Sequence, residues 1–466
     1  MMQIDVTLQA RHATALRELL QRPDGIEAAA YVMFGRNVVG IDPWSRRRRL
    51  RLVSHQVVPV PAGDEISASP RHVTWSTATF VSLCRQAAYR GLVPAIVHSH
   101  PAGMRAFSRQ DDVNERDLYR LLRNRNGTDA IMASVLLAGD DHFMARAWFD
   151  DKEPVAAEIV RSIGSRLLHF GGESGASNAA LVRQALLFGE AVNNRLASMR
   201  VGIVGCGGTG SATAMLLARL GVGQLALFDD DIVEISNLNR LHGARRADAD
   251  AMRPKVEVLA REITELGLGV RVHTHRGWIE NEAARDALKA CDVIFGCTDD
   301  HAGRLFLNRF SHFYLIPVID MGLAIEPASA DMRDMSARVT VLTPGAPCLS
   351  CRGVVDPKAA SEEALRRAAP EEYERQKREA YVRGGQNPAP AVVTFTTETA
   401  TLAVNELLQG LTDYRGEGGW AWERVRRLDR GIERKRGAIR SPHCPICARE
   451  DYWGRGDMDP FMDRIG

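Results

Sequence analysis

The chain has little excess charge, no long apolar stretch and few cysteines for its length. Its 466 residues include 60 Lys and Arg against 58 Asp and Glu, which leaves a formal charge of +2. A composition with so little net charge argues against a nucleic-acid partner that is bound through overall charge. No apolar run approaches the roughly 18 residues that a membrane span requires, and charges interrupt the N-terminal stretch where a signal peptide would be apolar. These absences predict a soluble, cytoplasmic protein that binds neither nucleic acid nor a membrane.

Eight cysteines are too few for a secreted disulfide scaffold of this size. Four of them stand singly in apolar or glycine-rich settings, and four form two Cys-x-x-Cys pairs, Cys348/Cys351 and Cys444/Cys447. A two-residue gap is typical of a tetrahedral thiolate metal site, and a pair of redox motifs is the alternative. The cysteines therefore favour a reducing compartment and one metal site.

The length predicts about three structural units at roughly 150 residues each. Residues 1–150 have the pattern of an α/β unit, with a helix over 10–20 that ends at the breaker Pro23-Asp24-Gly25. Buried strands are expected at 28–34, 93–97 and 131–137. Residues 151–178 are expected to connect this unit to the next through a helix around 155–170 and a turn-rich linker over 171–178.

Residues 179–466 alternate helical stretches with apolar strands, which indicates a parallel sheet flanked by helices. The expected strands include 224–228, 270–274 and 292–297. Residues 353–390 interrupt the pattern because from 357 onward they are charged, helix-prone and bounded by prolines. We expect them to form a mobile insertion, followed by a helix from near Val392.

A zinc-ligand pattern follows the second of the expected N-terminal strands. His98 and His100 alternate at a strand end and so share one face, and Asp111 follows in what is expected to be the first turn of a helix. Two imidazoles and one carboxylate leave a fourth tetrahedral position for water, as in catalytic zinc sites. Glu27 is the candidate general base, and Ser108 is the candidate for stabilising an oxyanion.

This spacing resembles the JAMM (JAB/MPN) metalloprotease motif at His98, His100, Ser108 and Asp111, with Glu27 where that family has its catalytic glutamate. The resemblance covers about the first 150 residues. It implies a zinc-dependent hydrolase that cleaves peptide or isopeptide bonds after the C-terminus of a ubiquitin-like protein.

A glycine-rich turn, VGIVGCGGTGS, joins a strand to a helix in the second region. Its Gly205, Gly207 and Gly210 form a GxGxxG pattern, which allows phosphates to approach the backbone at a helix N-terminus. The acidic group Asp229-Asp230-Asp231 ends the next strand, where a carboxylate can hold ribose hydroxyls. To this point NAD and ATP are both compatible with the sequence.

Three further motifs distinguish the two nucleotides: SNLNR over 236–240, RPKVE over 253–257 and CTDD over 297–300. Arg240 and Lys255 place two cations near the phosphates, which suits a triphosphate, and Asp299 is suited to hold Mg²⁺. The order of these motifs resembles the ThiF/MoeB/HesA superfamily, which includes the ubiquitin-activating enzymes. One departure is Leu241, where a glutamine often follows the arginine of SNLNR; we expect it to weaken one phosphate contact.

The resemblance implies adenylation of a C-terminal carboxylate with Mg-ATP. It assigns the phosphates to Gly207, Gly208, Asn237, Arg240 and Lys255, the ribose to Asp229 with Asp231 beside it, and magnesium to Asp299. Arg183 stands where the family has an arginine that reaches into the partner's site, so a homodimer is implied. The superfamily also brings two distant Cys-x-x-Cys pairs together around a structural zinc. That would place Cys348, Cys351, Cys444 and Cys447 at one site, with residues 441–466 as a zinc-binding tail and His443 as a bystander.

Many relatives carry an acceptor cysteine just before the helix that is expected from Val392, and this chain has no cysteine between Arg352 and Pro390. Direct transfer of the adenylate to a sulfur donor or to a separate conjugating or carrier protein is one explanation. Cys206 is too close to the expected phosphates to substitute. Ser361 is an alternative acceptor, although a helix cap before Glu362 is the simpler interpretation.

The sequence therefore predicts an α/β protein in which a JAMM/MPN domain precedes a Rossmann-like adenylation domain. Both would act on one ubiquitin-like partner, with Zn²⁺, ATP and Mg²⁺ as cofactors. The alternatives are activation of a sulfur carrier without protein conjugation, a scaffold protein with two inactive sites, and an NAD-dependent dehydrogenase.

Overall fold

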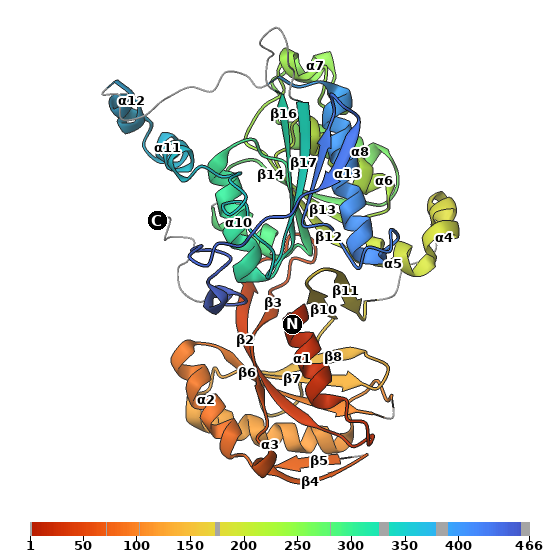
Figure 1. Ribbon diagram of the computed structural model, residues 1–466, viewed down its shortest axis with the longest axis vertical. Coiled ribbons are helices and arrows are strands. Elements are labelled where there is room, and N and C mark those ends of the chain that lie inside the picture. Colours follow the sequence, from red (N-terminus) through yellow and green to blue (C-terminus); the bar gives the residue numbers. More distant parts are fainter. Residues whose placement is uncertain are drawn as a thin grey trace. The chain divides into compact units, whose positions relative to one another are not determined.

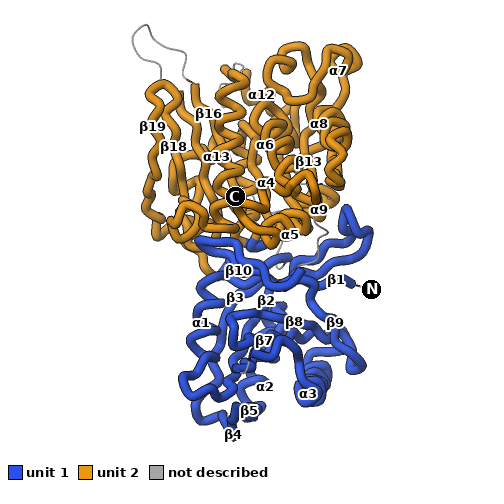
Figure 2. The backbone as a smooth tube through the Cα atoms, turned by 90° about the vertical axis from the view of Figure 1, so that its right-hand side faces the viewer, with its two compact units in different colours: residues 1–172, 313–315, 451–466 blue, residues 173–312, 316–450 orange. Residues whose placement is uncertain are grey.

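The computed structural model describes residues 2–457 except 71, 102, 173–177, 280, 326–334 and 379–389. The chain forms two compact α/β units. The first comprises residues 1–172, 313–315 and 451–466, and the second comprises 173–312 and 316–450 (Figure 2). None of the helices in the described ranges is long and apolar enough to cross a bilayer.

A nine-stranded mixed sheet is the centre of the first unit, in the order β11-β10-β1-β3-β2-β6-β7-β8-β9 (Figure 1). Its elements are β1 (Gln3–Gln9), α1 (Ala10–Leu20), β2 (Ala29–Val39), β3 (Arg49–Pro59), β4 (Glu65–Ser69), β5 (His72–Trp75), α2 (Ala78–Arg90), β6 (Val93–His100), α3 (Arg109–Asn126), β7 (Met132–Ala138), β8 (Phe143–Trp148), β9 (Val155–Ala156), β10 (Ile159–Ile163) and β11 (Leu167–Phe170).

Strand β2 shows why this sheet is covered on both faces. Its alternate residues Ala30, Val32 and Phe34 pack in one apolar cluster together with residues of α1. Tyr31 and Met33 point the other way, into a cluster with residues of α2 and α3. Because successive strand residues face opposite sides, this continuous apolar run buries both faces.

The expected helix over 10–20 is confirmed as α1, and the expected strands at 28–34, 93–97 and 131–137 correspond to β2, β6 and β7. The expected helix around 155–170 is wrong, because these residues form β9, β10 and β11. Strand β10 pairs in parallel with β1, and a turn at Gly164 leads into the antiparallel β11. The β-branched Ile159, Val160 and Ile163 suit this sheet position, and pairing with a distant strand overrides the local helical pattern.

The second unit contains an eight-stranded sheet in the order β14-β13-β12-β15-β16-β17-β18-β19. Pairing is parallel from β14 to β16 and antiparallel from β16 to β19. Helix α13 packs on α6 and on strand β16, and Figure 1 shows α10 on the other side of this sheet. Its elements are α4 (Val182–Phe188), α5 (Glu190–Ser198), β12 (Arg200–Val204), α6 (Gly208–Arg219), β13 (Gln224–Phe228), α7 (Arg246–Asp250), α8 (Lys255–Glu265), β14 (Arg271–His275), α9 (Glu282–Lys289), β15 (Val293–Gly296), α10 (His301–Tyr314), β16 (Val318–Ile325), β17 (Met335–Leu342), α11 (Pro357–Ala368), α12 (Pro370–Arg378), α13 (Val393–Thr412), β18 (Glu423–Arg427) and β19 (Ile432–Lys435).

The expected insertion over 353–390 contains the two helices α11 and α12, and its residues 379–389 lie outside the described residues. The expected cap at Ser361 is wrong. Asp356 is the N-cap of α11 and accepts a hydrogen bond from the backbone N–H of Lys358, while Ser361 lies inside the helix and donates to the Pro357 carbonyl.

Residues 451–457 pack within the first unit, although they follow the second unit in sequence. Trp453 is almost fully buried, and the Arg11 guanidinium lies 4.7 Å from the centre of its ring. The Nδ1 atom of His55 lies 2.8 Å from the Trp453 carbonyl oxygen. A side chain at Gly35 would collide with the Gly454 carbonyl, so the two backbones are in direct contact there.

Candidate active sites

Three side chains of the first unit converge in the geometry of a zinc site. The Nε2 atoms of His98 and His100 are 3.2 Å apart, and they lie 3.3 Å and 3.5 Å from the two carboxylate oxygens of Asp111. A tetrahedral zinc with bonds of 2.0–2.1 Å requires ligand atoms roughly 3.3 Å apart. One ligand atom from each of the three residues lies within 4.8 Å of the others, which is compatible with a single metal ion.

Strand and helix geometry produce this convergence. His98 and His100 alternate on β6, which ends at His100, and Asp111 is in the first turn of α3. Ser108 is the N-cap of α3, where its hydroxyl accepts a hydrogen bond from the Asp111 N–H, and the Ser108 N–H donates to the Asp111 carboxylate. This reciprocal capping fixes the carboxylate that faces the imidazoles. Ser108 also lines the cavity beside these three residues.

Glu27 lies in the same cavity, just before β2, in which Ala29 is paired with His98. Ser99, the residue between the two histidines, holds this segment from both sides. Its hydroxyl accepts from the Ala28 N–H at 3.0 Å, and its own N–H donates to the Ala28 carbonyl at 3.1 Å. Burial raises the pKa of Glu27 above its ordinary value, against the opposing effect of His100 and His98. A carboxylate with a raised pKa beside a metal-bound water is suited to exchange protons with it.

The cavity around these residues has a volume of about 310 Å³ and includes groups that the motif did not indicate. The hairpin of β4 and β5 contributes His72, Val73 and Trp75 to its wall. Helix α3 contributes Glu115, which could have been found because a residue four positions after Asp111 shares its helix face. No comparable sequence signal marks the hairpin.

A second cavity, of about 390 Å³, lies in the second unit at the carboxyl ends of β12, β13 and β15. Strand order reverses between β12 and β15, which is where open α/β sheets bind ligands. Gly205 has φ +89°, and a side chain at Gly210 would collide with the Gly205 carbonyl, so both positions require glycine. A side chain at Gly207 would meet open space inside the cavity. The turn therefore presents bare backbone at the start of α6, which suits phosphate oxygens.

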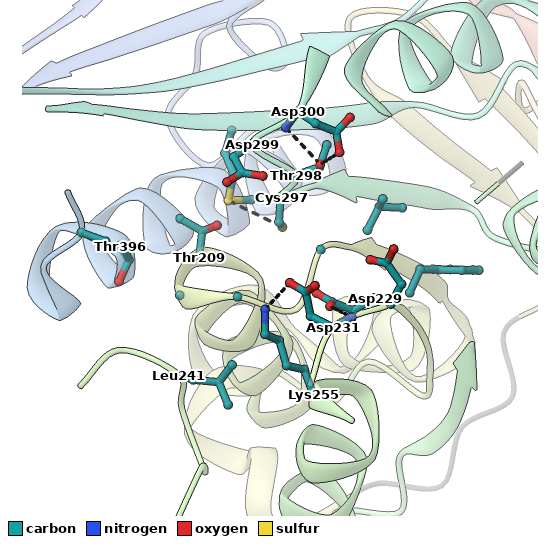
Figure 3. A pocket seen from close by; sticks show the side chains of 18 of the residues that line it. Thr209, Asp229, Asp231, Leu241, Lys255, Cys297, Thr298, Asp299, Asp300 and Thr396 are labelled. Carbon is teal, nitrogen blue, oxygen red and sulfur yellow. Dashed lines mark hydrogen bonds and ion pairs between the residues drawn. The ribbon is translucent and has the colours of Figure 1, made fainter. Parts of the chain in front are cut away.

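Acidic and basic groups face each other across this cavity. Lys255 and Asp231 are joined by an ion pair of 2.6 Å near Asp229, while Asp299 and Asp300 lie on the β15 side (Figure 3). Burial raises the pKa of Asp229, although Lys255 and the Cys206 N–H oppose the shift. Burial also acts to lower the pKa of Lys255, but Asp229 and Asp231 outweigh it and raise that pKa. Lys255 is thus a fully charged ammonium inside a largely enclosed site.

The other predicted contacts lie on the same cavity, with one exception. Gly208, Asn237 and Arg240 line it, as does Leu241, which packs in an apolar cluster with Val233 and Val258. Asp299 is exposed, and among the described residues its carboxylate has no hydrogen bond or ion pair. Arg183 is exposed on α4 and does not line the cavity of its own chain.

Sequence reasoning missed a cluster at the rim of this cavity. Arg367 of α11 lies 3.5 Å from the centre of the Trp278 ring and pairs with Asp300 at 3.3 Å. Glu363 of the same helix accepts a hydrogen bond from the Ala302 N–H at the start of α10. These contacts join residues far apart in sequence, so no local pattern could have indicated them.

The four paired cysteines lie together, all as free thiols. Cys348 Sγ is 3.6 Å from Cys444 Sγ, and Cys351 Sγ is 3.5 Å from Cys447 Sγ. Zinc–sulfur bonds of 2.3 Å place tetrahedral sulfurs about 3.8 Å apart, so the cluster fits a structural zinc. His443 is exposed and does not belong to the metal-ligand group that these four cysteines form. Cys206 is buried in the glycine turn, where its Sγ lies 3.8 Å from the Phe228 carbonyl oxygen.

The fold and the two cavities define a protein with one Rossmann-like unit and one α/β unit that carries a His–His–Asp group able to hold a metal ion. Residues 181–427 match the ThiF family, and residues 9–150 match the prokaryotic homologs of the JAB domain. The chain belongs to the ThiF family and carries a JAB domain at its N-terminus.

Relatives and solved structures match part of the chain. A SAMP-activating enzyme E1 of Haloferax volcanii is 31% identical over 157 residues, which are 34% of this chain and 54% of the relative. A sulfur carrier protein ThiS adenylyltransferase of Escherichia coli is 38% identical over 128 residues, which are 27% of this chain and 50% of the relative. A crystal structure of E. coli MccB with MccA-N7isoASN aligns with a TM-score of 0.45 at 20% identity, over 58% of this chain and 75% of that one. The chain spans about half the length of these two curated relatives.

Proposed function

We propose that the second unit adenylates the C-terminal carboxylate of a ubiquitin-like or sulfur-carrier protein with Mg-ATP. The observation that carries this proposal is the combination, in one cavity, of the bare backbone at Gly207 and the enclosed ammonium of Lys255. Two relatives named as an E1 and as a ThiS adenylyltransferase support the same chemistry. A dinucleotide would not need a second cation, Arg240, on the same wall.

Each residue has a part in this reaction. The N-terminus of α6 holds phosphate oxygens, and Asp229 accepts hydrogen bonds from ribose hydroxyls. Lys255 and Arg240 neutralise charge that develops on the phosphate as the carboxylate attacks and pyrophosphate leaves. Asp299 has a carboxylate free to hold Mg²⁺, which screens the phosphate charges when bound.

The first unit would process the same carrier protein as a zinc hydrolase. His98, His100 and Asp111 would hold the ion, which supplies a bound water of lowered pKa. Glu27 would accept a proton and return it to the leaving nitrogen, and Ser108 would donate a hydrogen bond to the carbonyl oxygen. The products are a free C-terminal carboxylate and an amine, so this step prepares the substrate of the second unit.

The fate of the adenylate separates conjugation from sulfur transfer. No cysteine occurs between Arg352 and Pro390, so a thioester on that segment of the chain has no acceptor. This observation favours the second candidate, activation of a sulfur carrier that ends as a thiocarboxylate. The other candidate is conjugation to a target protein through a separate conjugating enzyme. Within this chain, Ser361 is the alternative covalent acceptor, and it is exposed on α11.

A homodimer completes the proposal. Arg183 lies on α4 and does not line the cavity of its own chain. The same helix exposes Leu186 and Leu187, which a second copy would cover. Arg183 of one copy would then contact phosphates of the other.

The test is ATP–pyrophosphate exchange with candidate carriers, followed by intact mass of the products. Exchange that requires one carrier supports adenylation, and its loss in Lys255→Ala but not in the exposed control Lys435→Ala assigns it to this cavity. A mass gain that matches replacement of oxygen by sulfur selects sulfur transfer, and carrier joined to lysines selects conjugation. A covalent carrier adduct that disappears in Ser361→Ala would identify the acceptor. Absence of exchange with every carrier, trimmed or untrimmed, would contradict the proposal.

A further inference from the structure

Helix α11 touches the rim of the nucleotide cavity, although none of its residues lines that cavity. Its Arg367 guanidinium lies 3.5 Å from the centre of the Trp278 ring and pairs with the Asp300 carboxylate at 3.3 Å. Trp278 and Asp300 both belong to the cavity wall. Because Arg367 itself is outside the lining, it supports these two wall residues from outside the cavity.

The sheet topology assigns Trp278 to one end of the cavity. The glycine turn follows β12, and Asp229 follows β13, which is the next strand of the sheet. Trp278 follows β14, the strand beyond β13. A nucleotide with its phosphates on the glycine turn and its ribose on Asp229 therefore directs its base toward Trp278. An aromatic ring is a suitable wall there, because it can stack on the flat face of a base.

Specific contacts join α11 to Trp278 through the start of α10. Asp300 accepts a hydrogen bond from the Gly303 N–H, and Glu363, one turn before Arg367 on α11, accepts one from the Ala302 N–H at 2.8 Å. A Cβ atom at Gly303 would lie only 3.0 Å from the Trp278 ring, so the indole packs closely on α10. The place of the indole therefore depends on both helices.

We propose that Arg367 is a positioning residue of the nucleotide site, which holds the Trp278 ring where the nucleotide base packs against it. This inference rests on the proposed function and deepens it, because it names the wall that contacts the base and the helix that supports this wall. Binding of the base and docking of α11 then stabilise each other, since coupling between two sites is reciprocal.

Equilibrium binding to the full chain tests the proposal without a carrier protein. The probes are Mg-ATP and Mg-tripolyphosphate, which has three phosphates but neither ribose nor base. Arg367→Ala removes the support of the indole, and Arg367→Lys keeps a cation that can lie over the ring. Trp278→Leu keeps an apolar side chain but has no face for stacking. Arg366→Ala, at the exposed neighbouring position of α11, is the matched control.

We expect Arg367→Ala and Trp278→Leu to weaken ATP binding about tenfold and to leave tripolyphosphate binding unchanged. Arg367→Lys should recover part of the loss, and Arg366→Ala should bind both probes as the wild type does. Equal ATP affinity in Arg367→Ala and the wild type would overturn the proposal. An equal loss for both probes would also overturn it, because α11 would then support the whole cavity and not the wall for the base.

Hydrogen exchange adds a readout that a purely structural role of Arg367 would not change. ATP should slow exchange of the α11 amides in the wild type, whereas tripolyphosphate should not, and ATP should lose this effect in Arg367→Ala. Equal protection by both probes would contradict a role in contacting the base.

Failure of this inference is distinguishable from failure of the adenylation proposal. Base-dependent binding that is lost in Arg367→Ala, without pyrophosphate exchange for any carrier, would support the role of Arg367 and contradict adenylation. Carrier-dependent exchange with the same KM for ATP in Arg367→Ala and the wild type would support adenylation and overturn the role of Arg367. A wild type that binds neither probe would overturn both.

Discussion

Lys255 Nζ and Asp231 Oδ2 form an ion pair of 2.6 Å at the edge of the nucleotide cavity. Lys255 is mostly enclosed whereas Asp231 is two-thirds exposed, so the pair joins a fixed cation to an acid that water can solvate. A polyphosphate bound there, as we propose, would have to displace only this solvent-exposed carboxylate from the Lys255 ammonium. The ion pair orients the Lys255 ammonium in the cavity, and separating it from the solvent-exposed Asp231 costs little free energy.

Replacing Lys255 tests this view of the site. We expect Lys255→Ala to lower the rate of carrier-dependent ATP–pyrophosphate exchange by roughly 10²–10³-fold, because one preorganised charge at the developing phosphate charge is lost. Asp231→Asn should change exchange much less, since the lysine stays in place. An equal loss in both variants would indicate that the ion pair itself, and not the ammonium, is required.

Ser99 predicts a separable effect in the zinc unit. We expect Ser99→Ala to leave the Ala28 N–H buried without its acceptor, which costs about 1–3 kcal/mol of stability, and to loosen Glu27 next to it. Hydrolysis should fall about tenfold while the zinc content stays that of the wild type, because His98 and His100 face the other side of β6. Loss of zinc together with activity would contradict this assignment, and metal analysis beside kinetics distinguishes the two outcomes.

The cysteine cluster predicts a second metal ion, separate from the one expected at His98, His100 and Asp111. We expect Cys444→Ser to remove one of two zinc equivalents per chain and to lower the melting temperature of the second unit, because four thiolates around zinc contribute folding energy. His98→Ala should remove the other equivalent with little effect on that temperature. A cluster that instead oxidises reversibly to disulfides without bound metal would support the redox alternative.

His12 predicts part of the acid sensitivity of the first unit. Burial, with Arg11 and His55 nearby, lowers the pKa of His12 from 6.5 to about 3. Above pH 6.5 the residue is neutral in both states, and between pH 6.5 and 3 only the unfolded chain takes up the proton. Stability is therefore lost as the pH falls through this window, by up to about 1.4 kcal/mol per pH unit.

We expect His12→Asn to reduce the drop in melting temperature between pH 7 and pH 5. The asparagine offers a neutral partner to Ser54, whose hydroxyl lies 2.9 Å from the His12 Nδ1 atom. The exposed His443→Asn serves as the control and should retain the wild-type drop. Equal pH dependence in all three proteins would show that His12 is not responsible.

The sequence predicted the elements whose signals are local. The helix over 10–20 could be predicted from its apolar spacing and from the breaker after it. The glycine pattern from Gly205 to Gly210 predicted a strand, a turn and a helix within a few residues. The convergence of His98, His100 and Asp111 was predictable because two of them alternate on one strand and the third opens the next helix. Long-range pairing was not predictable. Residues 159–163 form a strand because they pair with β1, and Arg367 contacts Trp278 because α11 packs there. Glu115 lay between these cases, since its helix face was predictable but its hydrogen bonds to Arg146 and Trp148 join residues far apart in sequence.

The return of residues 451–457 to the first unit has a consequence for how the protein is made. On the ribosome, residues 1–172 emerge first, but the backbone that lies against Gly35 and the indole beside Arg11 emerge only after the second unit. The first unit is thus completed only after the second unit has been translated. Synthesis that stops within the second unit would leave the first unit without these contacts, so the hydrolase that we propose would be completed only together with the proposed adenylating unit.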